Sequence, residues 1–100
     1  MAIAICTVSG SLKDLSDNAV NGLVKAYAPP FFHGTELIAT EAMTTIDSDG
    51  DFEIELAETA SVSKTVTFEI EYYLNGVQKK KLYSDVTVPN QATANLSDIV

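Results

Sequence analysis

Two stretches alternate strictly between polar and apolar residues: DFEIEL at residues 51–56 and VTFEIEY at residues 66–72. Successive side chains of a β-strand point to opposite faces, so a period of two predicts strands with one buried face and one face in water. The side chains predicted to face the core are Phe52, Ile54, Leu56, Val66, Phe68, Ile70 and Tyr72. The fold is therefore expected to be built around these two strands.

Short runs rich in β-branched and aromatic residues recur on both sides of these stretches, and turn signals separate them. We expect strands at residues 2–9, 22–28, within 35–46, at 51–56, 65–73, 77–88 and 92–96. Within 35–46, apolar residues occur at both odd and even positions, so neither face of the strand is clearly the buried one. This is typical of a strand that is buried on both sides or carries a bulge. No long stretch has the 3.6-residue period of an amphipathic helix. The prediction is an all-β, Ig-like antiparallel β-sandwich of about seven strands, in one domain over residues 1–100.

The dipeptide NG at residues 75–76 signals a hairpin between the strands at 65–73 and 77–88. A two-residue turn would place Ile70 opposite Lys81, whereas a three-residue loop with a glycine bulge would place Glu69 opposite Lys81. Opposite charges on facing residues contribute about 0.2–1 kcal/mol per pair. Charge therefore predicts the three-residue loop.

The composition restricts the classes of partner. Fourteen acidic and six basic residues give a net charge of -8, which repels phosphate backbones and anionic lipid surfaces, so neither nucleic acid nor a membrane is expected as a partner. Cys6 is the only cysteine, so no intrachain disulfide can form, and we expect its thiol to be buried in the first strand. The first residues, MAIAI, lack the basic region and the apolar length of a signal peptide, which predicts synthesis in the cytoplasm without export.

Three segments together resemble the transthyretin-like, or carboxypeptidase regulatory-domain-like, branch of small β-sandwiches. They are VSG at residues 8–10, AVNGLVKAY at 19–27 and TTIDSDGDF at 44–52. The resemblance implies that Gly50 lets the chain reverse and that Phe52 enters the core. Members of this group are modules of cell-surface proteins, appendages of enzymes or structural proteins of bacteriophages.

A free-standing module of this kind without a signal peptide looks most like an accessory protein of a bacteriophage particle, such as a head decoration, neck, tail or fibre component. The resemblance thus implies a location in the virion, formed from protein made in the host cytoplasm, and viral structural proteins as partners. The alternative is a carbohydrate- or receptor-binding module. Edge strands and an outward tyrosine also leave self-association into a homo-oligomer open.

The candidate partner-binding residues come from a Pro/Phe segment and from a tyrosine pair. Two adjacent phenylalanines of an extended segment cannot both enter the core, so Phe31, Phe32 and the neighbouring His33 are candidates for a partner contact, with capping of the end of the sandwich as the alternative. In the same way one of Tyr72 and Tyr73 must face outward, and the strand pattern assigns that position to Tyr73.

Catalytic and metal-binding patterns are weak. Asp47, Asp49 and Asp51 resemble the opening of a calcium loop, but a strand at 51–56 leaves no room for the remaining ligands of an EF-hand, so a plain turn is favoured and no metal is expected. His33 is the only histidine, and no acidic residue adjoins it in sequence. We therefore expect neither a catalytic triad nor a cofactor, and the chain is predicted not to be an enzyme.

Overall fold

The computed structural model describes residues 4–39 and 41–100, and nearly all its regular elements are strands. This confirms the all-β class. The elements are β1 (Ile5–Ser11), β2 (Gly22–Tyr27), β3 (Phe31–His33), β4 (Glu36–Ile38), β5 (Glu41–Ile46), β6 (Asp51–Ala57), the 3-10 turn η1 (Ala60–Val62), β7 (Val66–Leu74), β8 (Val77–Val86), β9 (Thr93–Asn95) and the short helix α1 (Leu96–Ile99). The described chain thus has nine strands, more than the seven or so expected from the sequence.

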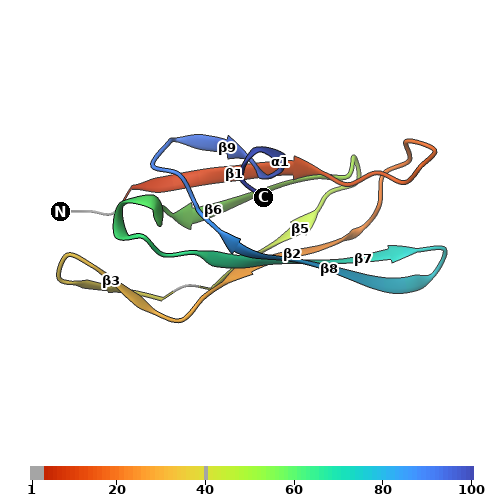
Figure 1. Ribbon diagram of the computed structural model, residues 1–100. Coiled ribbons are helices and arrows are strands. Elements are labelled where there is room, and N and C mark those ends of the chain that lie inside the picture. The colour runs from red at the N-terminus through yellow and green to blue at the C-terminus, as the bar shows by residue number, and fades with distance from the viewer. Residues whose placement is uncertain (1–3, 40) are drawn as a thin grey trace.

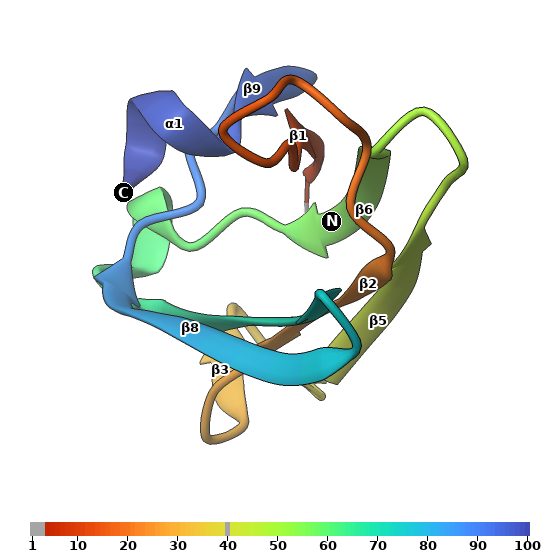
Figure 2. The same ribbon diagram turned by 90° about the vertical axis from the view of Figure 1, so that its right-hand side faces the viewer.

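The strands form two larger sheets and one small one. A four-stranded sheet has the order β5-β2-β7-β8, a three-stranded sheet has the order β6-β1-β9, and β3 pairs with β4 alone. Figures 1 and 2 show the three-stranded sheet lying across one face of the four-stranded sheet. Among the described residues, the strand pairs are antiparallel, as expected, except for β1 with β9, which is parallel.

The core lies between the two larger sheets and uses the residues that the alternation marked. The side chains of Phe52, Ile54, Leu56, Val66, Phe68 and Ile70 are buried, and Tyr72 is partly buried against the same cluster. Cys6 and Val8 on β1 are fully buried as well, which confirms the predicted environment of the thiol. Burial raises the pKa of Cys6, because a thiolate loses its hydration in apolar surroundings.

The register of the β7–β8 hairpin differs from the one that charge predicted. Leu74 pairs with Val77, so the loop contains only two residues, Asn75 and Gly76. Both have positive φ, 53° and 77°, as a type I′ turn requires, and the twist of that turn matches the twist of the flanking strands. Backbone geometry therefore outweighs direct pairing of opposite charges.

The irregularity of this hairpin lies at its other end. Val66 pairs with Val86, whereas Phe68 pairs with Tyr83, so the register shifts by one residue between the two pairs. Asp85 adopts a φ of 58° at this point. A uniform register would place Asp85 opposite Val66. The bulge removes this pair of a charged and an apolar residue and places Val86 opposite Val66 instead.

Several predicted boundaries move. The stretch 35–46 contains two strands, β4 and β5, and β4 forms a hairpin with β3, which lies in the Pro/Phe segment where no strand was expected. The last predicted strand, 92–96, shortens to β9 because α1 begins at Leu96. The strand predicted at 2–9 becomes β1, with residues 1–3 outside the described residues. Within the described ranges, no helix is long and apolar enough to cross a membrane.

Candidate functional site

The candidate site is the β3–β4 hairpin, called the arm below, which comprises residues 31–38. Proline has no backbone N–H to donate, so Pro29 and Pro30 end the pairing of β2 and separate the arm from the sheet. The chain then reverses at Gly34, whose φ is 62°. In the described part of the chain β3 pairs only with β4, and in Figures 1 and 2 the arm stands off from the end of the four-stranded sheet.

The two sides of the arm differ in burial. Phe31 is 5% exposed and pairs with the partly buried Ile38, so this side lies against the body of the protein. Phe32 and Leu37 pair with each other on the opposite side and are 64% and 61% exposed. The expectation that at most one phenylalanine enters the core is met, and Phe31 is the buried one.

His33 joins the arm to the segment that follows β6. Its Nε2 lies 3.4 Å from Oε1 of Glu58, and Glu58 is only 2% exposed. Ser61 donates a hydrogen bond from its hydroxyl to the same carboxylate oxygen, and its backbone N–H donates to Oε2 at 3.0 Å. These two bonds from Ser61, and then the contact with His33, hold the pKa of Glu58 below its ordinary value against the opposing effect of burial.

The cluster of Ser61, His33 and Glu58 contains the residue types of a hydrolytic triad but not its geometry. In a triad the histidine uses one ring nitrogen for the serine and the other for the carboxylate. Here Nε2 of His33 lies 3.4 Å from the hydroxyl of Ser61 and 3.4 Å from Glu58, and the hydroxyl donates to Glu58. The arrangement anchors the arm and does not provide the proton relay of a triad.

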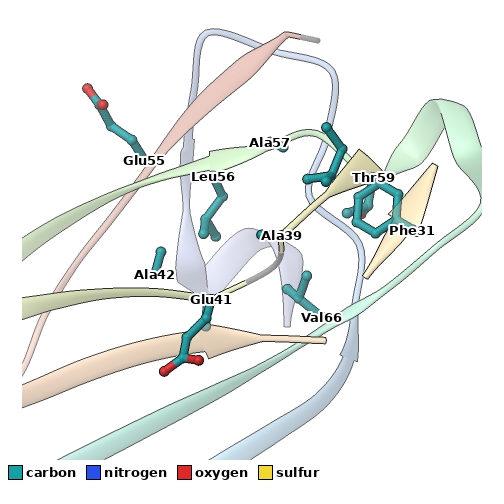
Figure 3. A pocket seen from close by; sticks show the side chains of 11 residues that line it. Phe31, Ala39, Glu41, Ala42, Glu55, Leu56, Ala57, Thr59 and Val66 are labelled. Carbon is teal, nitrogen blue, oxygen red and sulfur yellow. The ribbon is translucent and has the colours of Figure 1, made fainter. Parts of the chain in front are cut away.

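A small apolar cavity lies at the base of the arm (Figure 3). Its volume is about 130 Å³, and its apolar lining includes Ala26, Phe31, Ile38, Ala42, Leu56 and Val66. Figure 3 shows the carboxylates of Glu41 and Glu55 pointing away from the cavity. Binding sites for drug-sized molecules are about 300–1,000 Å³, so this cavity is too small for such a ligand.

The other predicted partner-binding residue lies elsewhere. Tyr73 is 56% exposed, as expected, whereas Tyr72 faces the core. Tyr73 stands near the turn end of β7, six positions beyond Thr67, and Thr67 pairs with Tyr27 next to the arm. At about 3.3 Å per residue along a strand, the two places are roughly 20 Å apart. The structure therefore does not bring Tyr73 into one site with Phe32.

The three aspartates of the predicted turn lie close together. Carboxylate oxygens of Asp47, Asp49 and Asp51 are within 4.8 Å of one another, and all three side chains are exposed. Oδ1 of Asp47 accepts hydrogen bonds from the backbone N–H groups of Asp49 and Asp51, both at 2.9 Å. Ser11 donates to Asp51. These bonds confirm the predicted turn and give Asp47 a structural role in it.

Sequence reasoning did not find Leu37, Glu58 or Ser61. The pattern of residues 35–46 predicts a single strand and does not single out Leu37, which lies in one half of a hairpin. Glu58 and Ser61 lie three residues apart on a segment without a regular period, and His33 reaches them only through the fold. Comparison of the chain with protein-family models, with curated proteins and with solved structures gave no match.

Proposed function

We propose that this chain is a non-catalytic binding module that attaches to another protein through the outward side of the arm. The observation that carries the proposal is the pairing of Phe32 with Leu37 on a hairpin with no other strand partner in the described chain, both side chains being more than half exposed. Apolar side chains that are exposed next to each other mark contact surfaces more often than singly exposed ones do. Aromatic side chains are also frequent anchors of interfaces.

The arm is suited to this task because its inner side is fixed. Phe31 is buried against the core, and His33 contacts the buried carboxylate of Glu58. Binding costs less conformational entropy when the contact residues are held in place beforehand. The outward pair of Phe32 and Leu37 thus resembles a prepared contact more than a mobile loop.

The biological setting in the proposal comes from the sequence resemblance. An acidic module of this type fits an accessory component of a bacteriophage particle, where it would bind a capsid, neck, tail or fibre protein. The net charge of -8 supports a protein partner over nucleic acid, since like charges repel at long range.

The test is co-sedimentation of the purified protein with phage particles that have been stripped of their native copy. Phe32→Ala and Leu37→Ala are the informative variants, because both side chains are exposed and truncating them leaves the core intact. Met43→Ala is the matched control, since Met43 is 63% exposed on β5, outside the arm. Phe31 is unsuitable because its loss would disturb packing.

Saturable binding that each arm variant weakens at least about tenfold, with Met43→Ala unchanged, is the expected result; tenfold corresponds to 1.4 kcal/mol of binding free energy. Binding that is equally strong for all variants would exclude the arm as the contact. If no particle or subassembly binds, the virion setting is wrong, and glycan arrays probed with the same variants test the carbohydrate-binding alternative.

A further inference from the structure

The four-stranded sheet has two edge strands, β5 and β8, and β8 carries the second feature of interest. β8 is the last strand of that sheet and pairs with β7 on one side and with no other strand of residues 4–39 and 41–100 on its other side. It is ten residues long, and nine of these are exposed or partly exposed. An unpaired strand edge presents backbone N–H and C=O groups to which another extended chain can add.

Positive charge is concentrated on this edge. Lys79, Lys80 and Lys81 are three of the six basic residues in a chain that has fourteen acidic ones. Lys80 is already neutralised, because its Nζ lies 3.2 Å from Glu69 and 3.7 Å from Glu71, and Glu69 raises its pKa.

The two flanking lysines are different. Lys79 pairs across the sheet with Tyr72 and Lys81 with Ile70, so both project from the face opposite Lys80. Neither forms an ion pair with a carboxylate among the described residues. Lys81 lies over the ring of Tyr83, 5.1 Å from its centre. The edge thus offers two unneutralised cations at alternate positions, on the same face of one strand.

We propose that the free edge of β8 binds an extended acidic segment of a partner protein, which adds to the sheet as a fifth strand. Residues directly opposite each other in neighbouring strands share a face. Carboxylates two residues apart in the added strand therefore meet Lys79 and Lys81. The next positions on that face lie opposite Val77 and Tyr83, which favour apolar residues. The segment read along its length is apolar-x-acidic-x-acidic-x-apolar, with x any residue.

The β8 strand of a second copy does not fit the β8 edge in this register. Two β8 strands paired about a twofold axis near Lys80 would place three lysines against three lysines, and like charges facing each other across strands are destabilising. Charge complementarity therefore selects an acidic partner.

The experiment measures binding of the full-length protein to a fluorescein-labelled peptide, acetyl-Val-Thr-Glu-Thr-Glu-Thr-Val-amide, by fluorescence anisotropy. Exchanging Lys79→Glu together with Lys81→Glu is expected to weaken binding at least about tenfold, since two attractions become two repulsions. The double variant Lys79→Gln and Lys81→Gln removes the positive charges without adding repulsion, so it should weaken peptide binding less. It also controls for a loss of binding that is caused by misfolding of the charge-reversed protein. Lys64→Glu is the control, because Lys64 is an exposed lysine outside β8.

A second arm of the experiment separates strand addition from simple charge attraction. Only alternate amides of an added strand bond to the edge, so N-methylation of one alternate set in the peptide should abolish binding while methylation of the other set should not. Equal binding of both methylated peptides, equal binding of the charge-reversed protein, or equal binding of a labelled oligothymidylate would each overturn the proposal. Phe32→Ala should leave peptide binding unchanged, which keeps this result independent of the arm.

Discussion

Ser61→Ala tests the contact that holds the arm to the body. The substitution removes the hydroxyl that donates to Oε1 of Glu58 and leaves the backbone N–H of Ser61 bonded to Oε2 at 3.0 Å. Ser61 itself is exposed, so little apolar packing is lost. The effect should therefore report one hydrogen bond to a buried carboxylate.

The magnitude follows from the charge of the acceptor. A hydrogen bond to a charged group contributes about 1.5–3 kcal/mol, and one between neutral groups about 0.5–1.5 kcal/mol. The pKa of Glu58 is lowered in the folded protein, chiefly by Ser61. Its contribution to stability is present above the unfolded pKa of about 4.3 and is lost as the pH falls through the lower folded value. The cost of Ser61→Ala should thus be about 1.5–3 kcal/mol at neutral pH and about half of that once the carboxyl is protonated.

Urea unfolding followed by circular dichroism measures both values. With a slope of about 1–3 kcal/mol per molar urea, the midpoint should fall by about 1 M at pH 7 and by less as the pH is lowered through the depressed pKa of Glu58. Ser97→Ala, at an exposed serine of α1, is the control and should change the unfolding free energy by less than about 0.5 kcal/mol. A midpoint shift that does not shrink as the pH is lowered through the titration of Glu58 would refute a charged acceptor, and a shift below about 0.3 M at pH 7 would refute the bond.

Three further predictions concern the core and the sheets. Phe68 is fully buried, so Phe68→Ala should cost about 3–5 kcal/mol in urea unfolding, and a loss below about 1 kcal/mol would contradict its central position. A Cβ atom at Gly22 would lie 2.1 Å from the backbone oxygen of Glu71. Gly22→Ala must therefore push β2 away from β7 and should lower the free energy of unfolding by about 2 kcal/mol or more in the same assay. An unchanged midpoint would show that the two strands are not so close. Burial raises the pKa of the Cys6 thiol, so a thiol reagent should react with native protein only as fast as unfolding exposes Cys6. Labelling of the native protein as fast as of the urea-unfolded protein would place the thiol on the surface.

Much of the sheet structure could be predicted from local patterns. The alternation in residues 51–56 and 66–72 marked the buried face correctly because a strand with one wet side needs it. The Asp-rich turn before Asp51 was also predictable, since Asp47 bonds to backbone groups only two and four residues away. One exposed phenylalanine in the Pro/Phe segment followed from the geometry of adjacent side chains.

The sequence by itself determined the all-β class, the buried faces and the presence of an outward aromatic, because each depends on residues within one strand or turn. Only the tertiary structure decided the β7–β8 register, where the backbone of Asn75 and Gly76 outweighed facing charges. It also decided that His33, which has no acidic neighbour in sequence, meets Glu58. The two residues are 25 positions apart, His33 in β3 and Glu58 in the segment after β6. Such contacts arise from tertiary packing, which no local sequence pattern records.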